Sequence, residues 1–205
     1  MRLDRLMARL RGLGLVASAA LFATAVRAAD LPPRALAALD QGRAYVDVRP
    51  DPDGESGIIQ AAIDIAAPPE AVFRVITDCD LAPKMVVSLK SCRIVERDPA
   101  GRWDVREEVS KMTFVPSVTN VFRSDYDPPR GVRFHRVGGD LKVFEGAWRI
   151  EPHGAGVRVF YENRVSAPFR VPGYLARIAL RLEVPQALMA LRRESMARAA
   201  PVRAP

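Results

Sequence analysis

The chain has 205 residues and a formal net charge of +7. Residues 1–28 hold five Arg and one Asp, so the other 177 residues carry 26 basic and 23 acidic side chains and a net charge of only +3. Because those charges are spread along the chain, outside an Arg-rich C-terminus, we expect no nucleic-acid partner. The remaining length fits one domain with a sizeable apolar core.

Residues 1–28 have the pattern of a signal peptide. The basic segment Met1–Arg11 precedes the apolar segment Gly12–Val26, and Val26 and Ala28 stand where signal peptidase requires small residues. The apolar run is shorter than the about 20 residues of a membrane span, which favours cleavage near Ala28 over an uncleaved N-terminal anchor. We therefore expect a periplasmic or secreted protein.

Residues 29–57 are expected to form an N-terminal leader with a short extra strand. A short helix is predicted over 34–39, and the alternation of apolar and polar residues predicts a strand over 45–48. Residues 50–57 are rich in Pro, Asp and Gly and predict a loop.

The main domain is expected over residues 58–198. Alternation from Ile58 to Ile65 predicts a half-buried strand. The run 68–70, Pro-Pro-Glu, then predicts a helix start, because Pro suits the first turn of a helix and Glu favours its positive end. A second short helix is expected after residues 78–80.

Six further strands are predicted, separated by short turns that are marked by Gly and Pro, which is typical of an antiparallel meander. These strands span residues 91–97, 103–112, 118–126, 132–137, 142–151 and 157–167.

The segment Val171–Met196 predicts one long amphipathic helix, because apolar residues recur on one side at helical spacing. Pro185 predicts a kink or a break within it, and residues 199–205 are expected to be a frayed tail. The order of elements predicts an α+β fold, in which a curved antiparallel sheet wraps around a long C-terminal helix, with two short helices after an early strand.

The two cysteines, Cys79 and Cys92, lie 13 residues apart. In an oxidising compartment such a pair predicts a disulfide, which would stabilise the fold by about 3 kcal/mol, although two buried free thiols are the alternative. We expect no metal site, because two Cys need two more ligands and neither His135 nor His153 has the spacing to supply them.

Four segments of the sequence resemble the START-like superfamily, also called SRPBCC or helix-grip. They are IDIAAPPEAVF at 63–73, TDCD at 77–80, KSCRIVE at 90–96 and FEGAWRI at 144–150. The first, a strand running into Ala-Pro-x-Glu-x-Val-aromatic, is the most specific. The nearest branch is the polyketide cyclase/dehydrase and coenzyme-Q-binding type, and the resemblance covers about residues 58–196.

The resemblance implies a deep apolar cavity between the sheet and the last helix. Members bind lipids, isoprenoids or polyketides; some carry the ligand and others transform it, so the fold alone does not choose between these functions. Strand alternation and helical spacing indicate which residues line such a cavity, although the same residues could instead fill a dry core. The expected ligand-binding residues are Val105, Val109, Phe122, Phe134, Phe144, Trp148, Tyr161 and Asn163 from the sheet, with Leu175, Ile178 and Leu182 as the helix lid.

Two residues are candidates for acid–base chemistry. Glu107 has the same strand parity as the expected cavity residues beside it, and burial would raise its pKa. A solvated strand residue is the preferred interpretation of Glu107, and a surface position is preferred for His135. The chain contains no nucleophile elbow, metalloprotease helix or phosphate-binding loop.

The preferred hypothesis is an exported, non-catalytic carrier or presenter of a hydrophobic small molecule or lipid. One alternative is a polyketide cyclase/dehydratase-like enzyme with Glu107 or His135 as acid or base; another is an interaction domain with a filled core. We expect a monomer without cofactor. Transient contact with a membrane surface is expected through apolar loops at 83–87 and 169–174, while the Arg-rich side of the last helix is interpreted first as a solvated face.

Overall fold

A computed structural model describes residues 31–52, 56–111, 116–169 and 173–199. The predicted signal peptide, Val171 and the predicted tail beyond residue 199 lie outside these described residues. All helices and strands belong to one unit, Pro32–Pro205.

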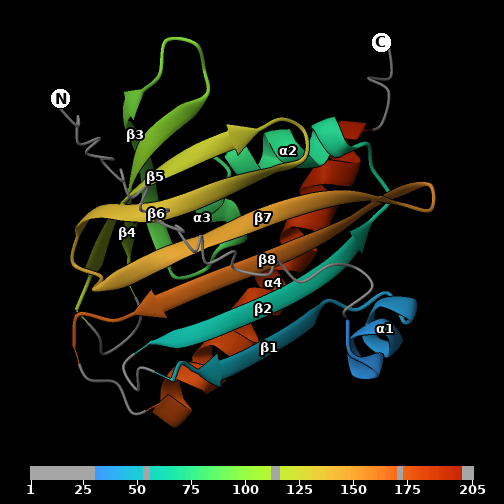
Figure 1. The fold of residues 1–205 in the computed structure, drawn as a ribbon, viewed down its shortest axis with the longest axis horizontal. Coiled ribbons are helices and arrows are strands. Elements are labelled where there is room, and N and C mark those ends of the chain that lie inside the picture. Colours follow the sequence, from blue (N-terminus) through green and yellow to red (C-terminus); the bar gives the residue numbers. More distant parts are fainter. Residues whose placement is uncertain (1–30, 53–55, 112–115, 170–172, 200–205) are drawn as a thin grey trace, which may run out of the picture. The chain divides into compact units, whose positions relative to one another are not determined.

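Eight antiparallel strands form one curved sheet (Figure 1). Their order across the sheet is β1-β2-β8-β7-β6-β5-β4-β3, so the early strand β2 pairs with the last strand β8 and hairpins make most other pairings. The strands are β1 Tyr45–Pro50, β2 Gly57–Ile65, β3 Leu89–Arg97, β4 Trp103–Ser110, β5 Val118–Asp127, β6 Gly131–Gly139, β7 Val143–His153 and β8 Gly156–Ser166.

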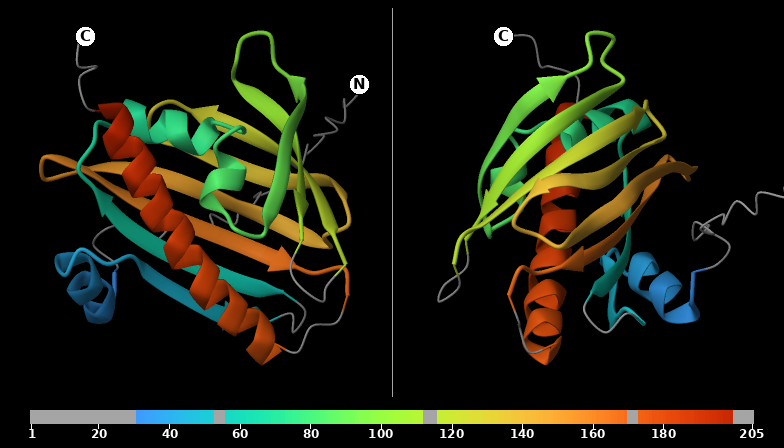
Figure 2. Two further views of the ribbon diagram at one scale, coloured as in Figure 1. Left: turned by 180° about the vertical axis from the view of Figure 1, so that it is seen from behind. Right: turned by 60° about the vertical axis from the view of Figure 1, so that its left-hand side comes forward.

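In the described residues four helices accompany the sheet: α1 Pro33–Asp40, α2 Pro69–Thr77, α3 Ala82–Met85 and α4 Gly173–Ala199. Helix α4 runs across one face of the sheet (Figure 2), where it also contacts α2 and α3, and α1 contacts β1 and β2. We call the sheet face toward α4 the inner face. This arrangement confirms the predicted α+β helix-grip fold.

Helix α4 continues through Pro185, so of the predicted kink or break, the break is wrong. A proline inside a helix removes one backbone hydrogen bond. The turns that follow pack into the core through Leu188 and Leu191, and this tertiary packing holds the helix together beyond the proline.

The apolar core lies at one end of the inner face. The end of β2 contributes Ile63 and Ile65, and the start of β8, paired with it, contributes Val157. Helix α2 and the second half of α4 cover these residues. By contrast, no residue of α4 from Tyr174 to Ala187 is buried, although Val184 packs against the core with part of its surface accessible.

Candidate ligand-binding site

Aromatic side chains from four adjacent strands meet on the inner face. Ring centroids are 5.0 Å apart for Phe122 and Phe144, 4.9 Å for Phe134 and Phe144, and 4.3 Å for Trp148 and Tyr161. Phe122 and Phe134 are buried, whereas Phe144, Trp148 and Tyr161 keep part of their surface accessible. We call these five residues, all expected from the sequence, the aromatic cluster.

Gly146 on β7 lets the ring of Phe134 lie across the neighbouring strand. A Cβ at position 146 would stand 2.7 Å from Phe134 Cζ, closer than carbon atoms approach in proteins, and would also meet the carbonyl oxygen of Glu162. The glycine of the FEGAW segment is therefore a packing requirement of the aromatic cluster.

Asn163 and Tyr161 form a polar pair at the β8 side of the cluster. Asn163 Nδ2 donates a hydrogen bond to Tyr161 OH over 2.8 Å. Burial raises the pKa of Tyr161, so its phenol stays neutral at physiological pH. Tyr161 and Asn163 were both expected on the inner face, and the structure places them there. Their role in binding a ligand stays a prediction.

Glu108 and Asn120 form a second polar pair, which the sequence did not reveal. They lie opposite each other in the register of β4 and β5, so both side chains are on the inner face. Burial raises the pKa of Glu108 to about 7, against the opposing effect of nearby Arg106. Asn120 has the same parity as Phe122, two residues later, and this was the available signal for its inward orientation.

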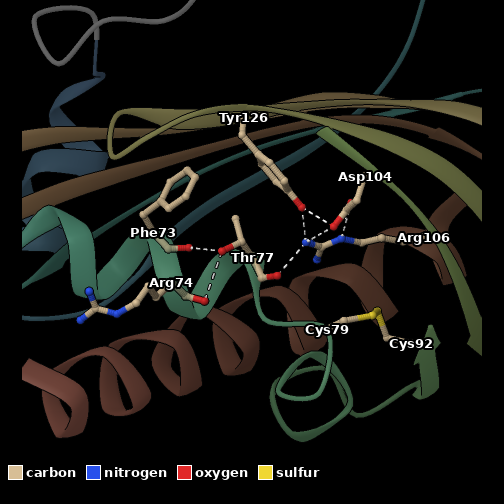
Figure 3. Close-up of polar contacts among 8 residues, drawn as sticks. All are labelled: Phe73, Arg74, Thr77, Cys79, Cys92, Asp104, Arg106 and Tyr126. Carbon is tan, nitrogen blue, oxygen red and sulfur yellow. Dashed lines mark hydrogen bonds and ion pairs between the residues drawn. A yellow bond between two sulfur atoms is a disulfide. The ribbon is translucent and has the colours of Figure 1, made fainter. Parts of the chain in front are cut away.

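A charged network attaches helix α2 to the sheet beside this site (Figure 3). Arg106 Nε donates to Asp104 Oδ1 over 2.9 Å, and Arg106 Nη2 donates to Tyr126 OH over 2.6 Å and to the Thr77 carbonyl over 2.7 Å. Tyr126 OH donates to Asp104 Oδ2. Because Asp104 and Arg106 are buried, the network fixes the end of α2 against β4 and β5.

Cys79 and Cys92 are joined in a disulfide directly after α2 (Figure 3), with their Cα atoms 5.4 Å apart. The disulfide connects the α2–α3 turn to β3, and Ser88 N donates to Glu183 Oε1 of α4 over 2.7 Å. The segment that carries α3 is thus attached to both the sheet and α4. An open hollow beside the disulfide is lined by Asp78, Asp80, Arg93 and Arg97 among others, so its chemistry does not suit an apolar ligand.

The predicted orientation of β4 is wrong. Asp104 and Arg106 are buried on the inner face, which places Val105, Glu107 and Val109 on the opposite face. Glu107 there accepts a hydrogen bond from Arg93 over 2.8 Å. The prediction failed because charged side chains on a strand usually face water, whereas here a closed network satisfies them inside.

The predicted lid surface of α4 faces away from the sheet. Leu175, Ile178 and Leu182 are 46%, 54% and 62% exposed. Leu180 and Val184 are half-buried on the sheet-facing side instead. Helical spacing identified an apolar stripe correctly, but periodicity does not say whether a stripe meets the protein or the solvent.

His135 lies exposed on β6, 3.9 Å from a carboxylate oxygen of Asp125. Because it is next to Phe134 on the strand, its side chain is on the face opposite the aromatic cluster. Within the described ranges, no cluster of three or more His, Cys, Asp or Glu side chains could hold a metal ion. None of the helices described combines the length and apolar character that a membrane span requires.

Residues 65–192, more than half of the chain, match the family described as polyketide cyclase/dehydrase and lipid transport. The chain belongs to this START-like family. The polyketide cyclase/dehydrase and lipid transport family includes both enzymes and carriers in its description, so membership leaves carriage and catalysis open. No curated protein matches the sequence.

Solved structures share the fold of this family member. A STAR-related lipid transfer protein from Xanthomonas axonopodis has a TM-score of 0.63 and 17% identity, covering 75% of this chain and 93% of that one. The protein TTHA0849 from Thermus thermophilus has a TM-score of 0.60 and 24% identity, with coverage of 70% and 99%. The Zhui aromatase/cyclase from a Streptomyces species has a TM-score of 0.54 and 16% identity, with coverage of 70% and 93%.

Proposed function

We propose that the protein is an exported, non-catalytic carrier that binds a hydrophobic small molecule or lipid between the inner face and the first half of α4. The observation that carries the proposal is the division of the inner face into two ends. The core end is sealed by Leu188 and Leu191 of α4. At the other end, Phe144, Trp148 and Tyr161 keep accessible surface, and no residue of α4 from Tyr174 to Ala187 is buried.

Burial of the ligand's apolar surface supplies the affinity, at about 25 cal/mol per Å² removed from water. The aromatic cluster offers ring faces and edges to such a ligand. The two polar pairs orient it, as the few polar groups of an apolar binding site do.

Loading requires an entrance, and the exposed side of α4 supports transient docking to an anionic membrane surface. Tyr174, Ile178 and Leu182 recur every fourth residue on this helix and are mostly exposed. Arg177 and Arg181 lie between them, and each cation near an anionic surface contributes about 1 kcal/mol. An apolar stripe bordered by cations suits the interface between lipid headgroups and acyl chains.

Native mass spectrometry of the protein purified from the periplasm, followed by organic extraction, tests the carrier proposal. We expect a co-purifying hydrophobic compound, and its loss in Leu180→Trp, because the larger side chain would occupy the proposed binding region between α4 and the inner face. Ala197→Trp, at an exposed site on the same helix, is the matched control and should keep the compound. A ligand-free mass, together with no thermal stabilisation by a panel of phospholipids, fatty acids and isoprenoid quinones, would refute the proposal.

Catalysis is the second candidate, because Glu108 lies on the inner face, where burial raises its pKa to about 7. A group with this pKa can both donate and accept a proton near neutrality. The extracted compound incubated with wild type and with Glu108→Gln separates the two functions. A product formed only by the wild type would replace the carrier assignment with an enzymatic one.

A further inference from the structure

Two buried oxygens on the inner face have no hydrogen-bond partner within the described part of the chain. They are Oδ1 of Asn120 on β5 and Oδ1 of Asn163 on β8, in side chains that are 6% and 5% exposed. A buried acceptor without a donor destabilises the folded protein, and nearly all such groups in native proteins are satisfied. The missing donors can therefore belong to a ligand.

The two asparagines lie on opposite sides of the aromatic cluster. Asn120 is opposite Glu108 at the β4–β5 pairing, and Asn163 is on β8 next to Tyr161. Strands β6 and β7 separate β5 from β8, and the rings of Phe134 and Phe144 extend from these two strands. The rings of the aromatic cluster therefore lie between the two asparagines.

The chemistry of these ends favours neutral hydrogen-bond donors. Each end presents a free amide oxygen, accompanied by the carboxyl group of Glu108 or the neutral phenol of Tyr161. Arg106, the cation that acts on Glu108, already binds Asp104, Tyr126 and Thr77. An anionic headgroup at either amide oxygen would meet an acceptor instead of a donor.

We propose that the ligand is a neutral, rigid ring compound with a hydroxyl group at each end, one donating to Asn120 Oδ1 and the other to Asn163 Oδ1. The aromatic cluster binds the ring system between them. This inference rests on the proposed function, because it specifies the class of hydrophobic molecule that the carrier holds.

Calorimetric titration with three diols of different size, each compared with its dimethyl ether, tests the inference. The probes are estradiol, diethylstilbestrol and bisphenol A; their ethers keep the ring system and lose both donors. We expect at least one diol to bind about tenfold more tightly than its ether, as a buried acceptor left without a donor predicts. In Asn120→Leu and in Asn163→Leu that preference should fall to less than about threefold.

Ser195→Ala is the matched control. Ser195 Oγ is also buried and without a partner in the described residues, but it lies on the second half of α4 among the core residues. Its removal should leave the preference for diols unchanged. The comparison of diols with ethers uses the wild-type protein, so it remains decisive even if an asparagine variant does not fold.

The outcomes separate this inference from the proposed function. If ethers or phospholipids bind as tightly as the diols, the hydroxyl-bearing ligand is refuted and the carrier function stands. If neither diols, ethers nor the lipid panel bind, both are refuted.

Discussion

Replacing Glu108 by Gln should stabilise the protein, and the gain should grow with pH. Glu108 is a carboxylic acid on the inner face whose pKa burial raises from 4.5 to about 7. The neutral amide of Gln has nearly the same shape and carries no charge at any pH. The variant therefore removes the cost of ionising a buried group while keeping the packing.

The magnitude follows from the two pKa values of Glu108. A pKa difference of one unit corresponds to 1.36 kcal/mol, so the rise to about 7 corresponds to about 3 kcal/mol. The folded state holds its proton up to a higher pH than the unfolded state does. Stability of the wild type is thus greatest below about pH 4.5, falls as the pH rises toward 7, and is then constant with respect to this group.

Urea unfolding of wild type and Glu108→Gln at about pH 5 and about pH 8 measures the effect. We expect a small difference at the lower pH and a gain for the variant of about 2–3 kcal/mol at the higher pH. Glu107→Gln is the control, because Glu107 is on the other face in an exposed ion pair with Arg93 and should change stability by less than about 1 kcal/mol. Equal behaviour of the two variants at about pH 8 would contradict the placement of Glu108.

Three further changes test the packing around the site by urea unfolding. Gly146→Ala should destabilise by about 1–3 kcal/mol because its Cβ would collide with the backbone carbonyl oxygen of Glu162 and with Phe134. Gly57→Ala is the control, because its Cβ would meet its nearest atom at 3.9 Å, and a similar cost for both variants would contradict the close packing at Gly146. Arg106→Leu should cost about 3–5 kcal/mol because it leaves Asp104 buried without its partner, and adding Asp104→Asn should recover part of the loss. Replacing both cysteines by Ser should cost about 3 kcal/mol under non-reducing conditions, and an unchanged midpoint would show that the disulfide does not constrain the unfolded chain.

Strand alternation predicted the aromatic cluster because β5 to β8 place its five rings on the inner face at alternate positions. The same rule failed on β4, where Asp104 and Arg106 satisfy each other inside the protein. A buried arginine needs acceptors for all its donors, and some of these acceptors come from other elements of the fold. For Arg106 one of them is the Thr77 carbonyl on α2, 29 residues earlier in the chain. Local sequence does not carry that information, so Val105 and Val109 were expected inside, whereas the preferred interpretation of Glu107 as a solvated residue agrees with its ion pair with Arg93.

The last helix illustrates a second limit of sequence patterns. Its apolar stripe at Leu175, Ile178 and Leu182 has the spacing of a core-facing surface, yet the structure exposes it. The sheet-facing side of the same half-helix includes Ala176, Leu180 and Val184, so both sides contain apolar residues. When hydrophobic residues surround a helix, tertiary contacts decide which side packs, and here α2 and the core fix the rotation through Leu188 and Leu191.

The pairing of β2 with β8 also sets the order in which this protein can fold. Gly57 pairs with Val165 and Ile65 with Val157, so strands from the two ends of the domain must meet before the sheet is continuous. Strand pairs separated by so many residues form slowly, because the chain loses the entropy of loop closure before the stabilising contacts between the strands are made. During synthesis the first two thirds of the chain lack the strand that completes their core. A polypeptide that stays unfolded until its last third emerges suits the export proposed above, since it can be translocated as an extended chain and fold afterwards.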